Sequence, residues 1–285
     1  MLHCVSRCWW RIRRDCMAEW AEVNGTCLRY EQRGCHGPWT VLLHEMGGCI
    51  ESWDGVVAEL DDSVRVLRFD QRGFGLSEKA CQVRIDMGTL VDDLTALLDS
   101  LGITEPVVLV GAALGAAHAL AYAARWPQRV GGLVISSPAT GGSSPASRSA
   151  MEARHDAIRR GGMRAVTNAM MAITYPPHVA WDPDAFRQHR RRWLGTDPGA
   201  FVAVNDMLAQ TDLQPSLATI TTPTLVIGCT HDTIRSPARS AEVAQLLQNA
   251  RFVECASGHY MPLQHPKAFV AELKAFLSTL YGVFA

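Results

Sequence analysis

The amino-acid sequence predicts an α/β protein with a doubly wound, mostly parallel sheet and a helical insertion between sheet strands. Three observations carry this prediction. Short apolar segments that suit buried strands alternate with segments of helical periodicity along most of the chain. The segment Pro106–Val110 is apolar on both faces, as strands at the centre of a helix-covered parallel sheet are. After Ser137 the alternation stops for a long helical stretch and then resumes.

The composition narrows the class of protein. Apolar residues make up 48% of the 285 residues and charged residues 19%, which supports a large core and excludes a mostly disordered chain. The formal net charge of −1 lacks the basic excess of a nucleic-acid binder, and no apolar run approaches the ~18 residues of a membrane span. None of the nine cysteines forms a C-x-x-C pair. We therefore expect free thiols, no metal site and a cytoplasmic location.

The first half of an α/β core is expected to begin directly after a short tail. Residues 1–17 carry four arginines but no apolar stretch of the kind found in signal peptides, so we interpret them as lying outside the fold. Asn24-Gly25 is a strong hairpin turn signal between two short strands. These and the following elements make residues 18–139 the first part of the core. Further strands are expected at 40–43, 64–69, 106–110 and 130–136, and helical segments at 52–60, 88–101 and 114–126.

Residues 140–215 are expected to form a helical cap, and residues 216–285 to complete the core. A helical insertion between two sheet strands belongs over the end of the sheet where ligands bind, so we predict that this segment covers the site. A loop rich in Gly, Ser and Pro spans 138–146, and helical segments follow at 148–160, 162–174, 183–194 and 198–210. The core then continues with strands at 224–228 and 251–255 and helices at 237–247 and 267–280.

The residues directly after each predicted strand are the candidates for a functional site, because ligands of doubly wound sheets bind beyond the carboxyl ends of the strands. The carboxyl ends of parallel strands meet at one edge of the sheet, so we expect these segments to lie close together. They are His44–Gly48, Asp70–Gly73, Gly111–Gly115, Cys229–Asp232 and Ser257–His259.

The order of these segments resembles the α/β-hydrolase superfamily from the first predicted strand to the end of the chain. Gly111-x-Ala113-x-Gly115 stands where those enzymes carry the G-x-S-x-G nucleophile elbow, a tight strand-to-helix turn. The resemblance implies the α/β-hydrolase fold. It also implies that His259 is the catalytic base and that Asp232 is the acid that orients it.

The segment after the 40–43 strand resembles the H-G-x-G oxyanion loop of the same superfamily. In that comparison the backbone N–H groups of Met46 and Leu114 would hold an oxyanion, and such donors contribute on the order of 3 kcal/mol each. Glu45 replaces the usual glycine of the loop. His44 is either a residue that bonds the backbone at the strand end or a part of the substrate site, and the resemblance favours the substrate site.

Ala113 departs from the superfamily pattern at the position of the nucleophile. A methyl group cannot attack a carbonyl, so the chain as given cannot form an acyl-enzyme. Three hypotheses remain open. The chain is a hydrolase in an inactivated or substrate-trapping form; or it is a cofactor-free lyase, isomerase or decarboxylase that uses His259 and Asp232 without a covalent intermediate; or its pocket only binds a ligand. The retained histidine and acid favour the first two.

Within the superfamily, the sequence is most similar to 3-oxoadipate enol-lactonases and related small-molecule lactonases and esterases. The resemblance implies a small, acidic lactone, ester or amide as substrate, and C–C bond hydrolases share the layout. Arg192 is the candidate for binding a substrate carboxylate and Trp193 for lining the pocket. No cofactor is implied; we expect no nucleic-acid or membrane partner, and a homo-oligomer is left open. The similarity rests on Arg159–Met163, Thr196–Pro198 and Pro223–Ile227.

Overall fold

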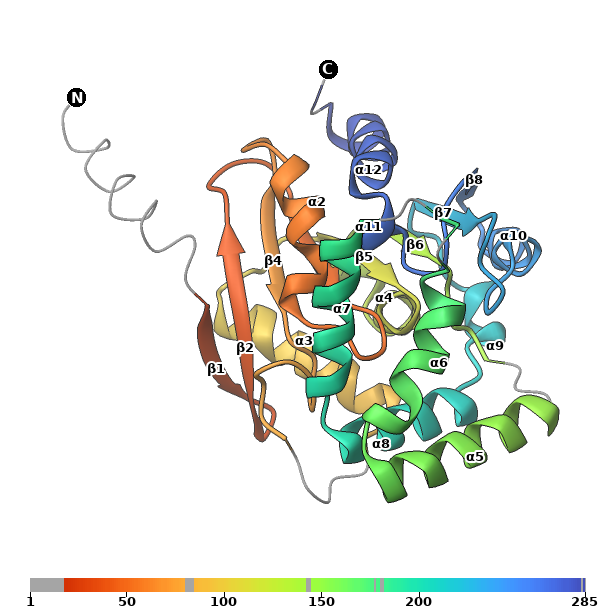
Figure 1. Ribbon diagram of the computed structural model, residues 1–285. Helices are drawn as coiled ribbons and strands as arrows, with labels where there is room; N and C mark the ends of the chain where they lie inside the picture. Colours follow the sequence, from red (N-terminus) through yellow and green to blue (C-terminus); the bar gives the residue numbers. More distant parts are fainter. Residues whose placement is uncertain are drawn as a thin grey trace.

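The computed structural model describes residues 18–79, 85–141, 145–176, 178–179, 182–282 and 284, without the side chains of residues 145 and 146. The predicted tail over residues 1–17 lies outside the described residues. Figure 1 shows one twisted sheet between layers of helices, with a further group of helices beside the strand ends. In the described part of the chain, no helix combines the length and the apolar character that crossing a bilayer requires.

The sheet has, within the described residues, eight strands in the order β1-β2-β4-β3-β5-β6-β7-β8. Pairs β1–β2 and β2–β4 are antiparallel, and every other neighbouring pair is parallel. This order confirms the predicted mostly parallel α/β sheet. The strands are β1 (Glu19–Val23), β2 (Thr26–Arg33), β3 (Trp39–Leu43), β4 (Arg65–Phe69), β5 (Val107–Ala112), β6 (Val130–Ser136), β7 (Thr224–Cys229) and β8 (Ala250–Cys255).

Local sequence explains both the edge and the centre of this sheet. Asn24 and Gly25 have positive φ angles of 46° and 69°, as the two-residue hairpin turn favoured by Asn-Gly requires. Every residue of β5 is buried, because helices cover both faces of the sheet at its centre. The apolar run that predicted a central strand is therefore the strand that leads into the elbow.

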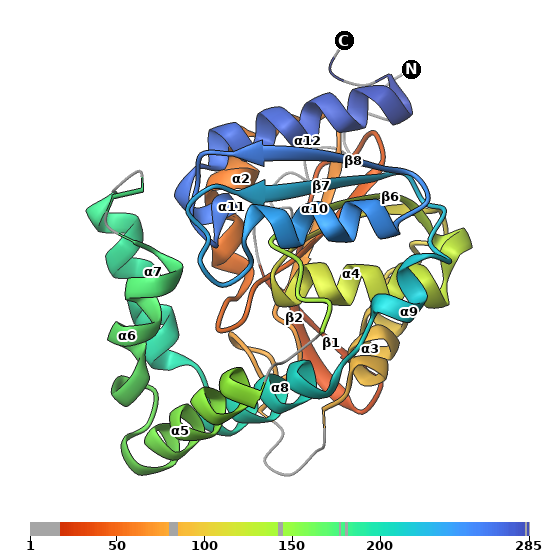
Figure 2. The ribbon, with the colours of Figure 1, turned by 90° about the vertical axis from the view of Figure 1, so that its right-hand side faces the viewer.

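Helices form a layer on each face of the sheet (Figure 2). Helices α3, α4 and α10 pack on one face, in a core that includes Leu94, Leu120 and Val243. Helices α2 and α12 pack on the other face, around Trp53 and Phe269. The helices of the core are η1 (Ile50–Trp53), α2 (Asp54–Glu59), α3 (Met87–Ser100), α4 (Leu114–Arg125), η2 (Pro127–Arg129), α10 (Pro237–Leu246), α11 (Met261–Gln264) and α12 (Pro266–Tyr281).

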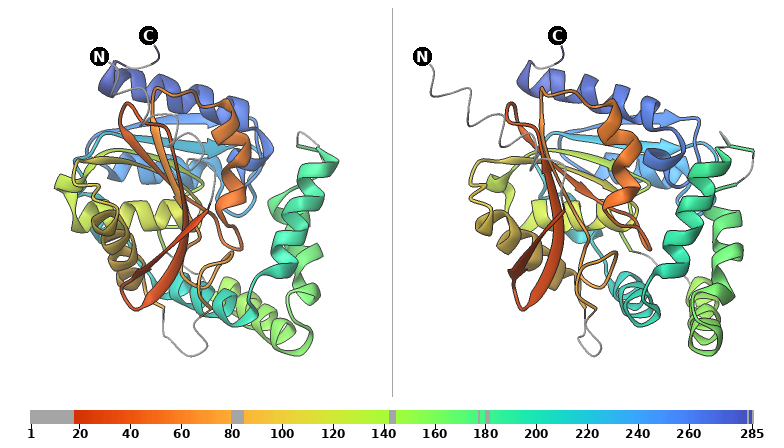
Figure 3. Two further views of the ribbon diagram at one scale, coloured as in Figure 1. Left: turned by 90° about the vertical axis from the view of Figure 1, so that its left-hand side faces the viewer. Right: turned by 60° about the vertical axis from the view of Figure 1, so that its left-hand side comes forward.

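The segment between β6 and β7 contains helices and no strand in its described residues, and Figure 3 shows its longer helices grouped to one side of the sheet. The predicted loop over 138–146 is too long, because α5 already begins at residue 145, and the short α9 was not predicted. The exact division into core and cap at residues 140 and 215 stays a prediction. The helices are α5 (Pro145–Gly161), α6 (Arg164–Thr174), α7 (Pro183–Gly195), α8 (Pro198–Gln210) and α9 (Gln214–Leu217).

Two of these helices begin at Asp-Pro pairs. The Asp182 side chain accepts hydrogen bonds from the N–H groups of Asp184 and Ala185 at the start of α7. Asp197 accepts from Ala200 at the start of α8. A proline follows each of these caps at the first helical position, where its missing N–H costs nothing. The sequence thus fixes where both helices start.

The helical segment packs on the carboxyl ends of the strands. Met46, which follows β3, and Leu114, which follows β5, share a buried apolar cluster with Trp193 of α7 and Phe201 of α8. This packing holds α7 and α8 over the edge of the sheet at which the predicted site segments end. A cavity between the sheet and this helical segment is therefore lined by residues of both.

Candidate active site

The elbow is a sharp turn between β5 and α4, with Ala113 at its apex. Ala113 has φ 50° and ψ −104°, a strained conformation for a residue other than glycine, which costs on the order of 1–3 kcal/mol. A Cβ on Gly115 would collide with the backbone of Leu43, and one on Gly111 would collide with the backbone of Gly115. The two glycines therefore allow the strand and the helix to approach closely enough to form the turn.

His259 and Asp232 form a buried hydrogen-bonded pair. Nδ1 of His259 lies 2.7 Å from Oδ2 of Asp232. The other carboxylate oxygen, Oδ1, accepts the backbone N–H groups of Ile234 at 2.8 Å and Arg235 at 2.9 Å. An ionised carboxylate only accepts hydrogen bonds, so we assign the proton to Nδ1, which leaves Nε2 of His259 as the nitrogen that can take a proton.

Opposing effects set the pKa of Asp232. Burial raises the pKa, but the hydrogen bond and electrostatic attraction of His259 and the backbone N–H of Arg235 lower it by more, so the net pKa lies below its ordinary value. The carboxylate is therefore ionised at neutral pH. A buried negative charge at this distance favours a protonated imidazole during a reaction.

A cavity of about 560 Å³ lies between the sheet end and the cap helices. It brings together five of the predicted site residues: Met46, Ala113, Leu114, Trp193 and His259. Asp232 contacts His259 from behind and does not itself line the cavity. Helices α5, α6, α7 and α8 all contribute to the cavity wall. Their lining residues include Arg154, Met170, Trp193, Phe201 and Asn205.

The two predicted oxyanion donors border this cavity. Leu114 is the first residue of α4, where a backbone N–H has no acceptor within the helix. Met46 lies in a turn in which Gly48 donates its N–H to the carbonyl of Glu45 across 3.0 Å. The buried Glu45 carboxylate accepts a hydrogen bond from the Ser52 hydroxyl at 2.9 Å and packs against Gly48. Glu45, which replaces the usual glycine of the loop, thus connects this turn to η1 through a hydrogen bond.

His44 supports the loops and does not face the cavity. Its Nδ1 donates to the Glu45 carbonyl across 2.8 Å, and its Nε2 accepts the N–H of Gln71 across 2.9 Å. The Gln71 amide returns a hydrogen bond to the His44 carbonyl at 2.8 Å. Both ring nitrogens are thus committed to the backbone, and His44 is absent from the cavity wall in the described residues. The expectation that His44 binds substrate is corrected: it joins the β3 and β4 loops.

Arg192 and Trp193 are neighbours in sequence but border different spaces. Trp193 is fully buried and lines the same cavity as Ala113. Arg192 instead lines a separate cavity of about 440 Å³, together with Cys49 and Glu51. Consecutive residues on a helix point in directions about 100° apart, which explains the separation. The structure does not bring Arg192 to the site, which corrects the expectation that it binds substrate there.

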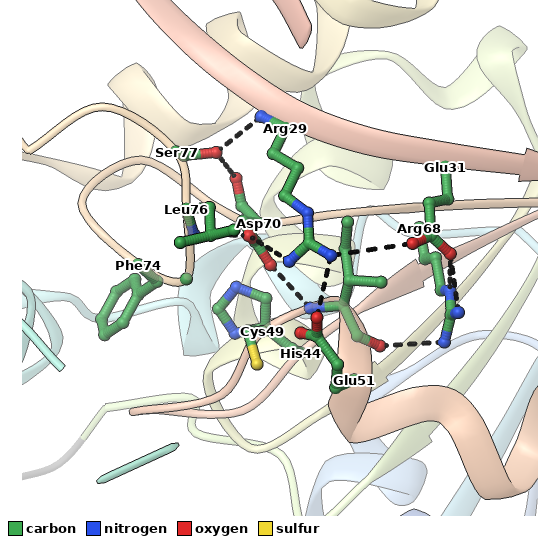
Figure 4. Close-up of polar contacts among 12 residues, drawn as sticks. Arg29, Glu31, His44, Cys49, Glu51, Arg68, Asp70, Phe74, Leu76 and Ser77 are labelled. Atoms are coloured by element: carbon green, nitrogen blue, oxygen red, sulfur yellow. Dashed lines mark hydrogen bonds and ion pairs between the residues drawn. The ribbon is translucent and has the colours of Figure 1, made fainter. Parts of the chain in front are cut away.

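Asp70 organises the loops beneath that separate cavity (Figure 4). Its Oδ1 accepts the N–H of Ile50 at 2.6 Å, and its Oδ2 accepts the N–H of Leu76 at 2.7 Å and contacts Arg29 at 3.3 Å. Arg29 also pairs with Glu51 at 2.8 Å. The buried carboxylate is therefore neutralised and bonded by protein groups.

One group of potential metal ligands occurs in the described residues: Cys49, Glu51 and Asp70. Arg29 already pairs with both carboxylates, so its guanidinium supplies the positive charge that a metal ion would otherwise bring to this cluster. Burial, followed by a hydrogen bond and negative charge from Glu51, raises the pKa of the Cys49 thiol. Cys49 is therefore held as a thiol, which supports its interpretation as a buried apolar side chain and not as a nucleophile.

Sequence reasoning missed three arginines that line the cavity: Arg154, Arg235 and Arg239. No aspartate or glutamate is among the described lining residues. Arg154 could have been found from helical spacing, because Ala150 and Met151 lie one turn before it on the same face of α5. The other two lie on the loop after Asp232 and on α10, and no periodic signal distinguishes them from surface residues.

The fold and the elbow define this chain as an α/β-hydrolase. Residues 38–261 match the serine aminopeptidase S33 family, and the chain belongs to this family. The structural neighbours include an enol-lactonase and an esterase, which are hydrolases.

Proteins of known sequence or structure resemble most of the chain. A pyrrolizixenacetamide deacetylase from Xenorhabdus hominickii is 26% identical over 85% of this chain and 91% of its own length. The enol-lactonase from Burkholderia xenovorans LB400 has a TM-score of 0.85 and 30% identity, covering 91% of this chain and 100% of that one. A thermophilic esterase from Thermogutta terrifontis, solved with malate bound, has a TM-score of 0.84 and 25% identity, covering 93% and 99%.

Proposed function

We propose that this chain is the nucleophile-deficient form of a hydrolase for small acidic esters, lactones or amides. The substrate carbonyl binds over Ala113, with its oxygen toward the N–H groups of Met46 and Leu114 and with His259 as the neighbouring base. The observation that carries the proposal is the intact His259–Asp232 hydrogen bond at 2.7 Å beside a cavity that also contains the elbow. A pocket that only binds a ligand would not need this pair.

The charge of the cavity supports an acidic substrate. Three arginines and no carboxylate are among the described lining residues, so an anion would gain favourable interactions throughout the cavity. The resembling proteins include an enol-lactonase, a deacetylase and an esterase with malate, a small dicarboxylate, bound. These names share small carbonyl compounds as substrates, and we propose the same class of substrate for this chain.

Alanine limits the chemistry of the chain as it stands. The methyl group of Ala113 cannot form an acyl-enzyme, so a bound ester meets the base and the oxyanion donors but no side-chain nucleophile. The expected behaviour is substrate binding with little turnover. C–C bond hydrolysis would need the same groups and is covered by the same proposal.

A second candidate function uses His259 without a covalent step. Because the carboxylate of Asp232 is ionised, His259 can accept a proton from water or from a carbon next to a carbonyl. A lyase, isomerase or decarboxylase would need only this base and the oxyanion donors. This candidate predicts turnover by the unmodified chain that is lost in His259→Ala.

We also place the protein in the cytoplasm as part of this proposal. The described cysteines Cys27, Cys49, Cys229 and Cys255 are free thiols, as proteins of reducing compartments have.

The test compares the unmodified chain with Ala113→Ser. Both are assayed against short p-nitrophenyl esters, enol-lactones and aryl amides. The proposal expects turnover near background for the unmodified chain and hydrolysis by Ala113→Ser that is lost when His259→Ala is added. A folded Ala113→Ser variant that hydrolyses nothing would reject the proposal. Turnover by the unmodified chain that depends on His259 would instead support the second candidate.

A further inference from the structure

We propose that Arg154 determines substrate specificity by binding a carboxylate that lies away from the reacting carbonyl. This inference rests on the proposed function, because it names the residue that recognises the charge of the substrate. Arg192, the candidate from the sequence, lines another cavity. We assign the binding of the substrate carboxylate to Arg154 instead, which lies on a different helix of the cap and lines the cavity of the site.

Arg154 reaches the cavity from the cap side. Residues 147, 150, 151 and 154 of α5 all line the cavity, and their spacing of three and four residues places them on one helix face. His259 and Ala113 line the same cavity from the core side. A substrate with its carbonyl at Ala113 therefore extends toward α5, where its far end meets Arg154.

The guanidinium of Arg154 has only neutral partners among the described residues. One Nη donates to the side-chain oxygen of Asn205 at 2.7 Å, and the other contacts the sulfur of Met170 at 3.4 Å. Nε is buried and has no hydrogen-bond partner there. Burial also lowers the pKa of Arg154, so its charge is poorly solvated. The remaining Nη hydrogens are free to donate to an anion in the cavity.

Two other arginines of this protein, Arg72 and Arg68, are largely buried and paired with carboxylates. Arg72 contacts Asp93 at 2.6 Å, and Arg68 contacts Glu31 at 2.6 Å. Buried charges are normally paired in this way, because removing a charge from water is costly. Arg154 lacks such a partner in the described residues, and a carboxylate from the substrate would supply it, with the planar geometry that a guanidinium recognises.

The other two cavity arginines are weaker candidates. Burial and the positive charge of Arg239 lower the pKa of Arg235, but the negative charge of Asp232 acts against them and offsets part of its charge. The Arg235 guanidinium also donates to the backbone carbonyl of Ile234 at 3.2 Å. Arg239 is exposed to solvent, so its interaction with an anion is screened by water and salt. Arg154 is therefore the cation whose charge a bound substrate would compensate most.

The kinetic test uses two esters in the Ala113→Ser background: mono-p-nitrophenyl glutarate, which is acidic, and p-nitrophenyl pentanoate, its neutral counterpart. Arg154→Met is expected to lower kcat/KM for the acidic ester about 10- to 100-fold, mainly through KM, and to change the neutral ester less than about twofold. Arg154→Lys is expected to restore part of the preference. If Arg154 had only a structural role, Arg154→Met would lower kcat/KM for both esters by the same factor, and this result would overturn the inference.

Arg190→Met is the matched control. Arg190 is also a cap arginine whose side chain donates to an asparagine, Asn168 at 3.0 Å, but this hydrogen bond is exposed and Arg190 does not line the cavity. It should leave the ratio of the two esters unchanged. Arg235→Met and Arg239→Met run in parallel, and loss of the preference in either one but not in Arg154→Met would assign the carboxylate elsewhere.

Binding to the unmodified chain separates this inference from the proposed function. Isothermal titration with glutarate and with pentanoate needs no turnover, so it decides the matter even if Ala113→Ser hydrolyses neither ester. The inference expects glutarate to bind more tightly than pentanoate, and this advantage to fall about 10- to 100-fold in Arg154→Met. Equal binding of the two acids, or an advantage that survives Arg154→Met, would contradict it.

Discussion

His259 donates its Nδ1–H to Oδ2 of Asp232 across 2.7 Å, in a chain whose nucleophile position holds alanine. The pair is buried, and Asp232 receives two further backbone hydrogen bonds that fix its orientation. The acid and the base are thus held in place independently of Ala113. Restoring a hydroxyl at that position would add one atom to a site that is otherwise built.

Replacement of Asp232 by asparagine should remove the function of the base while preserving its packing. An amide at this position can donate to the histidine, which favours the wrong tautomer of His259. In the Ala113→Ser background we expect kcat to fall by about 10⁴-fold, as in serine hydrolases with the same arrangement. Ester hydrolysis at pH 7 measures this. A loss below tenfold in a folded variant would show that Asp232 does not orient the base.

Acid should destabilise the protein through two buried histidines. Burial lowers the pKa of His118 and of His189 to about 3, against 6.5 in the unfolded chain. Between these values the unfolded chain binds more protons than the folded one, so the free energy of unfolding falls as pH drops below about 6.5. The expected slope is about 1.4 kcal/mol per pH unit for each histidine.

Urea denaturation between pH 7 and 5 measures this slope. His189→Phe removes one titrating group, so the free energy of unfolding should depend less steeply on pH. The substitution breaks no hydrogen bond, because both ring nitrogens of His189 lack hydrogen-bond partners among the described residues. The lowered pKa of Asp232 acts only at more acidic pH, so it does not interfere in this window. An unchanged slope in His189→Phe would show that His189 is protonated in the folded state.

Gly115 should tolerate no side chain. A Cβ there would meet the backbone of Leu43, which cannot move without disturbing the central sheet. We expect Gly115→Ala to lower the free energy of unfolding by about 3 kcal/mol or to prevent folding. Gly195→Ala is the control, since nothing lies within 4 Å of a Cβ at that position, and it should change stability by less than about 1 kcal/mol. Equal effects of both substitutions would argue against a tight elbow.

Much of the fold could be predicted because the relevant signals are local. The apolar run of β5, the Asn24-Gly25 turn and the Asp-Pro starts of α7 and α8 each lie within a few neighbouring residues. The convergence of Met46, Ala113, Leu114 and His259 on one cavity also followed, because the carboxyl ends of parallel strands share an edge.

The substrate-binding side chains could not be predicted in the same way. Whether an arginine of the cap faces the cavity depends on how the helices rotate and pack, which a run of charged residues does not specify. Arg192 and Arg154 illustrate this, since they line separate cavities. His44 shows a second limit: its position after β3 suits both a ligand contact and a backbone support, and only the partners of its two nitrogens distinguish them.

Fluorophosphonate labelling of the Ala113→Ser variant tests the central claim most directly, because the probe reacts only with a serine that a neighbouring base activates. The account predicts a single labelled site at residue 113 by mass spectrometry, no labelling when His259→Ala is added, and unchanged labelling when Cys49→Ala is added. A folded Ala113→Ser variant that takes up no probe at residue 113 would contradict the claim that this elbow, base and acid form a hydrolase site.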